Sequence, residues 1–221
     1  EAPSAEAYEG LANPTELSLS RIQQIISSFA DSATRAIRAG FDAIEIHAAH
    51  GYLLHEFLSP LSNHRVDDYG GSFENRTRIV REVVEAVRSV MPESMPLFVR
   101  ISATDWFDDG WSLEESIQLS RVLETLGVDF IDVSSGGLAK SQPITLGPGY
   151  QMGFAKAISD AVSCSVGTVG LITEAQQAED ALQDGVGEVV LMGRQFLREP
   201  SYALRAAREL GAELSWPGQY E

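Results

Sequence analysis

The sequence predicts an α/β fold built on a parallel β-sheet. Five short runs rich in apolar residues alternate with stretches whose apolar residues recur at helical spacing. Short, mostly apolar runs are typical of strands buried on both faces of a parallel sheet. The runs are Ala43–His47, Leu97–Ile101, Phe130–Ser134, Ser165–Val169 and Glu188–Met192. Strands that alternate with helices favour right-handed βαβ units.

The first two helices are predicted from periodicity. An irregular lead-in, Glu1–Pro14, precedes a helix that ends before Gly40, and a second helix follows Ser72. The turn-rich segment from Leu58 to Ser72 is expected to be a long loop packed over the end of the sheet. The periodic residues are Ile22, Ile25, Ile26, Phe29, Ala33 and Ile37 in the first helix, and Ile79, Val83, Val84 and Val87 in the second.

Three later helices are predicted from their ends. Ser112-Leu113-Glu114-Glu115 and Thr173-Glu174-Ala175-Gln176 match the capping box, which satisfies free backbone N–H groups at a helix start. Pro200 is expected in the first turn of the last helix, where a missing N–H group costs nothing. The glycines expected to end these helices are Gly127, Gly185 and Gly211.

The length of the chain leaves two arrangements open. A complete (β/α)8 barrel takes about 250 residues, and this chain uses its 221 residues on five units. Either three units of a barrel are missing, or the sheet is an open, doubly wound one.

Charge and composition exclude several classes of protein. The 16 Lys and Arg residues stand against 32 Asp and Glu, a net charge of -16, so we expect no nucleic-acid partner. No apolar run approaches the roughly 20 residues of a membrane span, so we expect no membrane partner. A single cysteine, Cys164, excludes an internal disulfide and fits a reducing compartment, which predicts a cytoplasmic protein.

All four histidines fall in one region, and two of them, His47 and His50, leave the first strand three residues apart. The carboxyl ends of strands are where α/β folds bind ligands. One buried histidine would most simply bond a backbone carbonyl, and a metal site would need a third ligand. We therefore predict no metal, and favour two imidazole donors that converge on one oxygen atom.

Arg100 lies inside an apolar strand, where a guanidinium needs an anionic partner. One interpretation pairs it with an acid, the candidates being Asp105, Asp132 and Glu45. The favoured interpretation is that Arg100 faces the end of the sheet and holds a bound anion or an electron-rich ring.

The last two strands are each followed by a glycine-bearing turn. Gly170 follows the fourth strand, and Gly193 and Arg194 follow the fifth. Glycines let backbone N–H groups approach a phosphate, and arginine adds a forked cation. These residues predict a phosphate site, although glycines after strands also serve turn geometry alone. The dinucleotide motif G-x-G-x-x-G is absent.

Four stretches together resemble the old yellow enzyme family of FMN-dependent ene-reductases, which are NADH:flavin oxidoreductases. They are IEIHAAHGYLLHEFLSPLSNHRVDDYGGSFENRTR, LFVRIS, GTVGLIT and LMGRQFLREP, and the resemblance extends over the whole chain. Histidine at both His47 and His50 resembles the thermophilic-like subgroup. The resemblance implies a (β/α)8 barrel, with residues 1–221 as the C-terminal part of a single FMN-binding domain without an internal boundary. The five strands would then be barrel strands four to eight.

The resemblance also implies roles for individual residues. His47 and His50 would bond the carbonyl oxygen of an α,β-unsaturated substrate, and Tyr52 would line the substrate pocket. Arg100 would lie beside the flavin ring, and Gly170, Gly193 and Arg194 would hold the FMN phosphate. NADPH or NADH would reduce the flavin in the same pocket, and the substrate would be a small enone.

The departures from the family pattern bear on partners. The proton-donating Tyr belongs to the first three units, and the family subgroup's C-terminal Arg does not follow Gln219-Tyr220-Glu221. We therefore expect a complementary N-terminal barrel segment or chain, or self-association into a homo-oligomer, because an open sheet exposes its edges. Two other functions stay open. One is a non-catalytic half-barrel that binds a phosphate ligand or a complementary chain. The other is a phosphate-binding isomerase or aldolase with His47 or His50 as acid/base.

Overall fold

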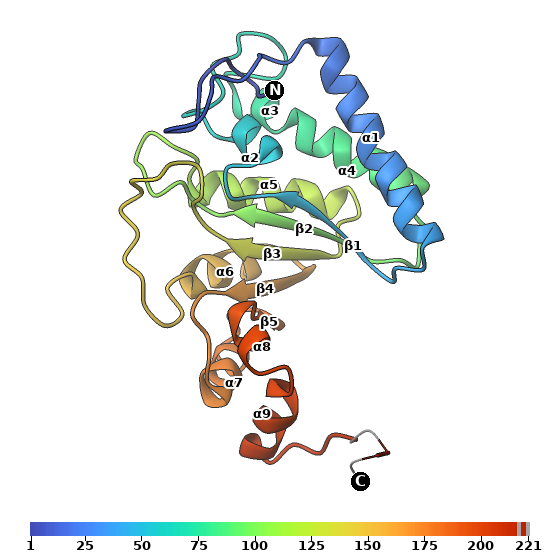
Figure 1. The fold of residues 1–221 in the computed structure, drawn as a ribbon, viewed down its shortest axis with the longest axis vertical. Helices are drawn as coiled ribbons and strands as arrows, with labels where there is room; N and C mark the ends of the chain where they lie inside the picture. The colour runs from blue at the N-terminus through green and yellow to red at the C-terminus, as the bar shows by residue number, and fades with distance from the viewer. Residues whose placement is uncertain (216–217, 220–221) are drawn as a thin grey trace.

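Five parallel strands form one sheet in the order β1-β2-β3-β4-β5, which is also their order along the chain (Figure 1). The structure is a computed structural model that describes residues 1–215 and 218–219. Because crossovers between parallel strands are right-handed, an uninterrupted order places the connecting helices on one face. A doubly wound sheet would need the order to reverse, so that alternative is wrong. The sheet has the strand order of a barrel with two open edges, β1 and β5.

The strands lie within one or two residues of their predicted bounds. They are β1 Ile44–Ala48, β2 Leu97–Ser102, β3 Phe130–Ser134, β4 Ser165–Val169 and β5 Val189–Leu191. The helices are α1 Leu19–Arg38, α2 Leu53–Leu58, α3 Phe73–Arg76, α4 Arg78–Val90, α5 Leu113–Thr125, α6 Met152–Ser159, α7 Ala175–Gln183, α8 Arg194–Arg198 and α9 Tyr202–Leu210.

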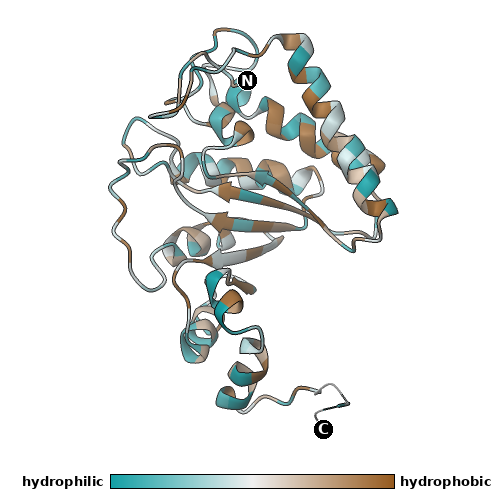
Figure 2. Cartoon of the chain, viewed as in Figure 1, coloured by the Kyte–Doolittle hydropathy of each residue, from teal (hydrophilic) through white to brown (hydrophobic). Residues whose placement is uncertain are grey.

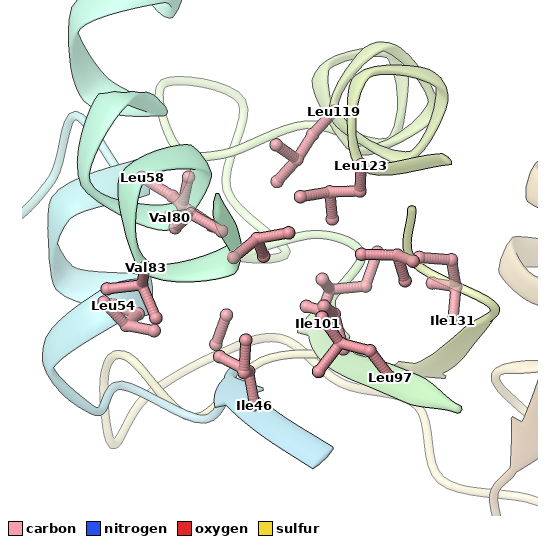
Figure 3. Close-up of a cluster of buried hydrophobic side chains, with 14 of the residues drawn as sticks. Ile46, Leu54, Leu58, Val80, Val83, Leu97, Ile101, Leu119, Leu123 and Ile131 are labelled. Carbon is pink, nitrogen blue, oxygen red and sulfur yellow. The ribbon is translucent and has the colours of Figure 1, made fainter. Parts of the chain in front are cut away.

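Side-chain alternation gives the sheet two different faces. One face packs against the helices and carries the main hydrophobic core. The strand residues on that face and the inner sides of the helices are therefore apolar (Figure 2). Figure 3 shows this core, in which Ile46, Leu97, Ile101 and Ile131 of the sheet lie near helical residues such as Leu123. The opposite face carries the polar residues of the strands, and these build the site described below.

Most helix ends match their predicted signals. Ser112 and Glu115 form both bonds of the capping box at the start of α5. Four glycines have left-handed backbones at or just after a helix end, as expected for C-terminal caps, namely Gly40, Gly127, Gly185 and Gly211. The predicted helix after Ser72 is divided at Thr77 into α3 and α4, and Ser72 caps α3.

Two predicted helix starts are wrong. Thr173 does not cap α7, because the N-cap is Glu174 and makes no side-chain bond. Instead, Gln177 Oε1 accepts from the Thr173 N–H group at 3.1 Å, so a side chain inside the helix satisfies that donor. Pro200 lies before the first turn of α9, whose N-cap is Ser201.

The edge beside β1 leaves an apolar groove open. The groove has a volume of about 460 Å³ and lies between α1 and β1, where it is lined by Ile25, Phe29 and Ile44 among others. These three residues are half-buried although they belong to the apolar side of their elements. No helix among the described residues is long and apolar enough to cross a membrane.

Candidate active site at the carboxyl ends of the strands

Three neighbouring strands place a polar residue in one row across the open face of the sheet. In the strand register His47 of β1 pairs with Arg100 of β2, and Arg100 pairs with Asp132 of β3. Residues opposite each other in a sheet project to the same side, so all three side chains face away from the helices. The row therefore comes from strand register alone.

Arg100 pairs with an acid, which was one of the two interpretations left open by the sequence. Its Nε atom lies 3.0 Å from Asp132 Oδ2, and the side chains of Arg100 and Asp132 are 29% and 1% exposed. Of the three candidate acids, Asp132 is the partner, and Asp105 belongs to another network described below. Arg100 also lines a cleft, so the pairing does not remove it from the site.

His47 and His50 lie together, as their spacing predicts, and Tyr52 lies beside His47. The ring of His47 is 5.2 Å from the ring of His50 and 5.3 Å from the ring of Tyr52, measured between centroids. Tyr52 is 64% exposed, whereas both histidines are half-buried.

An unusual backbone positions His50. His50 has φ 59° and Gly51 has φ 73°, so two successive residues are left-handed. A side chain at Gly51 would collide with the carbonyl oxygen of Gly137, which shows how closely the two loops approach. Ser102 Oγ accepts from the His50 N–H group at 2.9 Å and donates to Gly136 O at 2.7 Å. The ends of β1, β2 and β3 are thus tied together at His50.

The His50 ring is held by the end of β3. Its Nε2 atom lies 2.7 Å from Ser134 Oγ. Gln151 supports this strand end, because Gln151 Oε1 accepts from Ser135 Oγ at 2.5 Å and lies 3.4 Å from Ser134 Oγ. Gln151 Nε2 donates to Val169 O at 3.0 Å, which extends the network to β4.

Both site histidines are neutral at neutral pH. Burial, and after it the charge of Arg100, lower the pKa of His50 to about 4. Burial and Arg100 likewise lower the pKa of His47. A neutral imidazole has one N–H donor, so each ring can donate one hydrogen bond to a ligand.

The other two histidines lie outside this cluster. His55 is fully buried, with Nδ1 accepting from the Gly51 N–H group at 2.9 Å and Nε2 2.9 Å from Asp105 Oδ1. Burial alone would raise the pKa of Asp105, but bonds from His55, Ser59 and the Trp111 N–H group outweigh it and lower that pKa. His64 lies near the surface, 3.1 Å from Glu6.

One cleft of about 300 Å³ is lined by all four residues predicted to hold a phosphate-bearing ligand. They are Arg100, Gly170, Gly193 and Arg194. Gly170 has φ 137°, a conformation that requires glycine, and its carbonyl accepts from the Gly149 N–H group at 2.8 Å. Within the part of the chain that the structure describes, Arg194 makes no ion pair.

The cleft also contains residues that the sequence did not single out for this role. Ser134, Tyr150 and Gln151 line it, and Ser134 connects it to the histidines. The position of Ser134 at the end of a strand was a usable signal, whereas Gln151 lies in a connection with no motif. Among residues 1–215 and 218–219, no group of three or more potential ligands of a metal ion is present.

Parallel strands in sequence order, with a ligand cleft across their carboxyl ends, define a (β/α)-barrel protein. The chain belongs to the NADH:flavin oxidoreductase / NADH oxidase family, whose sequence profile matches residues 2–213. The resemblance found in the sequence is therefore confirmed at the level of the family.

Curated relatives extend beyond the region that they share with this chain. The NADPH dehydrogenase of Bacillus subtilis (strain 168) is 47% identical over 221 residues, which are 100% of this chain and 64% of the relative. The NADPH dehydrogenase of Geobacillus thermodenitrificans (strain NG80-2) is also 47% identical, with the same coverage of 100% and 64%. The chain thus spans about 64% of the length of these relatives.

Solved structures likewise match nearly all of this chain with only part of their own length. Morphinone reductase in complex with tetrahydroNAD has a TM-score of 0.79 and 27% identity, covering 99% of this chain and 61% of the other. An old yellow enzyme homologue from Zymomonas mobilis has a TM-score of 0.77 and 26% identity, covering 97% and 62%. The five strands are therefore part of a (β/α)8 barrel, as the resemblance implied.

Proposed function

We propose that this chain carries the main part of an FMN-dependent oxidoreductase that uses NADPH or NADH to reduce the C=C bond of α,β-unsaturated carbonyl compounds. One observation carries the proposal, namely the cleft that joins Arg100 to Arg194 directly beside the His47–His50 pair. Membership of the family supports a flavin. The relatives named NADPH dehydrogenase, and the morphinone reductase solved with tetrahydroNAD, support a nicotinamide reductant.

The charge of the cleft and its glycine residues support FMN as the ligand. Arg194 supplies a cation for the phosphate, and Gly170 and Gly193 let backbone N–H groups come close. Apart from its two chain neighbours, no described residue has an atom within 4 Å of the position that a Cβ would take at Gly193, so space remains there for a ligand. Arg100 lines the same cleft as Arg194 and would face the electron-rich edge of the flavin ring.

The histidine pair would bind the substrate carbonyl. Each neutral imidazole of His47 and His50 would donate one N–H to the oxygen, and the two bonds strengthen as negative charge develops there. When bound, reduced FMN supplies the hydride that the β-carbon accepts. Tyr52 beside His47 would form one wall of the substrate pocket.

The remaining barrel units would complete this site. We assign residues 1–221 to the C-terminal part of a single FMN-binding barrel domain, and a complementary N-terminal segment or chain to the edges at β1 and β5. The groove beside Ile25, Phe29 and Ile44 supports such a partner, because apolar side chains lie there half-buried. The proton donor for the α-carbon would come from this partner, and a homo-oligomer is a further way to cover the edges. The single cysteine supports a cytoplasmic location.

An FMN titration of the purified, desalted protein, with and without the complementary segment, tests the proposal. We expect quenching of flavin fluorescence at stoichiometric FMN and oxidation of NADPH or NADH when an enone is added. Flavin binding without turnover would favour the non-catalytic half-barrel. Turnover of a sugar phosphate without flavin would favour the isomerase or aldolase and would contradict the proposal.

A further inference from the structure

Asp132 is a buried acid that contacts Arg100, one of the arginines that line the cleft. Its side chain is 1% exposed, and its Oδ2 atom lies 3.0 Å from Arg100 Nε. Its position in the register, directly opposite Arg100 on the neighbouring strand, fixes this pairing through the backbone of β2 and β3.

The ion pair makes the two sides of the Arg100 guanidinium differ in their surroundings: one side contacts Asp132, and the other lines the cleft. The Nε atom of Arg100 is buried and lies 3.0 Å from Asp132 Oδ2 as an ion pair, without a hydrogen bond to any described residue, whereas the side chain as a whole is 29% exposed and lines the cleft. A guanidinium held on one side by an ion pair keeps its terminal nitrogen atoms free for a ligand. Asp132 Oδ1 is also buried and has no hydrogen-bond partner among the described residues.

We propose that Asp132 is a positioning residue for Arg100: its carboxylate holds the guanidinium by their ion pair, offsets part of its charge and thereby lowers the redox potential of the bound flavin. The inference rests on the FMN site proposed above. The reduced ring carries one more negative charge than the oxidised ring, since it takes up two electrons and one proton. Arg100 stabilises that added charge, and a carboxylate 3.0 Å from Arg100 opposes the stabilisation.

The charge state of Asp132 agrees with this role. Its burial raises its pKa to about 6, with Glu45 acting in the same direction and Arg100 against both. The carboxylate is therefore mostly ionised at neutral pH.

The test compares Asp132→Asn with wild-type holoenzyme by spectroelectrochemical titration of the flavin. We expect the ratio of reduced to oxidised flavin at a given potential to rise about tenfold, which equals about +30 mV for a two-electron couple. Asp129→Asn is the matched control. It removes the same charge just before the first residue of β3, where Asp129 pairs with Arg88. We expect the control to leave the potential unchanged.

Flavin that stays bound to Asp132→Asn with the wild-type potential would overturn the inference. An equal shift in Asp129→Asn would also overturn it, because a general charge effect would then suffice.

A second measurement uses the flavin-free protein, so it remains possible if Asp132→Asn does not retain flavin. Hydrogen exchange of the Arg100 Nε–H, followed by NMR in the flavin-free protein, should be at least tenfold faster in Asp132→Asn than in wild type. Equal exchange rates would overturn the positioning role. Failure of wild-type protein to bind FMN at all would instead contradict the proposed function, so the two failures are distinguishable.

Discussion

Ser134 Oγ lies 2.7 Å from His50 Nε2, so the last residue of β3 holds the ring of a histidine that follows β1. The Ser134 hydroxyl has two acceptors within reach, His50 Nε2 at 2.7 Å and Gln151 Oε1 at 3.4 Å. Donation to Nε2 would place the proton of the neutral imidazole on Nδ1, which would then be the donor that a carbonyl oxygen requires.

Substitution Ser134→Ala should weaken binding of a phenol, which mimics the enolate-like oxygen of the substrate. One lost hydrogen bond is worth about 1 kcal/mol, so we expect roughly fivefold lower affinity in an absorbance titration of the FMN-loaded protein. Ser120→Ala is the control, because Ser120 is equally buried but donates to Ser116 O within α5. Equal phenol affinity in Ser134→Ala and Ser120→Ala would contradict the role of Ser134.

Substitution of both His47 and His50 by Ala should remove the two donors. We expect phenol affinity to fall roughly 30-fold, for about 2 kcal/mol of lost bonds, while FMN affinity is retained. The exposed histidine His64 provides the matched control, since His64→Ala changes neither site. Phenol binding that survives in the double variant would refute the assigned role of the pair.

Substitution Arg194→Ala should weaken FMN retention. A charge-assisted bond contributes about 1.5–3 kcal/mol, so the FMN dissociation constant should rise roughly 10- to 100-fold in a fluorescence titration. Arg208→Ala, on the last turn of α9, removes the same charge away from the cleft and should leave FMN affinity unchanged. A phosphate site at Arg194 is untenable if both variants bind FMN alike.

His50 should make the protein less stable in mild acid. Its pKa falls from 6.5 in the unfolded chain to about 4 in the folded protein, mainly through burial. Between these pH values the unfolded chain binds a proton that the folded protein does not, so the free energy of unfolding decreases as the pH falls. We expect His50→Asn to lose less stability than wild type between pH 6.5 and 5 in urea titrations. Identical losses in the two proteins would argue against the lowered pKa, and His64→Asn serves as the control.

Substitution Gly51→Ala should destabilise the fold. The added methyl would meet the backbone of Gly137, and φ 73° disfavours a side chain, so we expect a loss of about 2 kcal/mol or more in the free energy of unfolding. Gly153→Ala in α6 is the control, since nothing lies within 4 Å of its added methyl. Equal stability of the two variants would mean that the two loops can separate without cost.

The sequence predicts local features well and pairings between strands poorly. Short apolar runs located all five strands, and the His47–His50 spacing located the histidine cluster. Asp132 was one of three candidate partners of Arg100, because only the register between β2 and β3 distinguishes it from the others. Thr173 matched a capping motif, yet Glu174 is the N-cap of α7, and Gln177 Oε1 accepts from the Thr173 N–H group. Gln151 gave no signal, because its partners come from β3 and β4.

The row of His47, Arg100 and Asp132 limits where insertions and deletions can occur in the chain during evolution. Insertion of one residue within β2 would turn Arg100 toward the helices and Val99 or Ile101 toward the ligand, so chemistry and core would fail together. The connections between strands carry no such register, so their length can vary away from close approaches such as that of Gly51 and Gly137. A change of length is therefore easier to accommodate in a loop than in a strand.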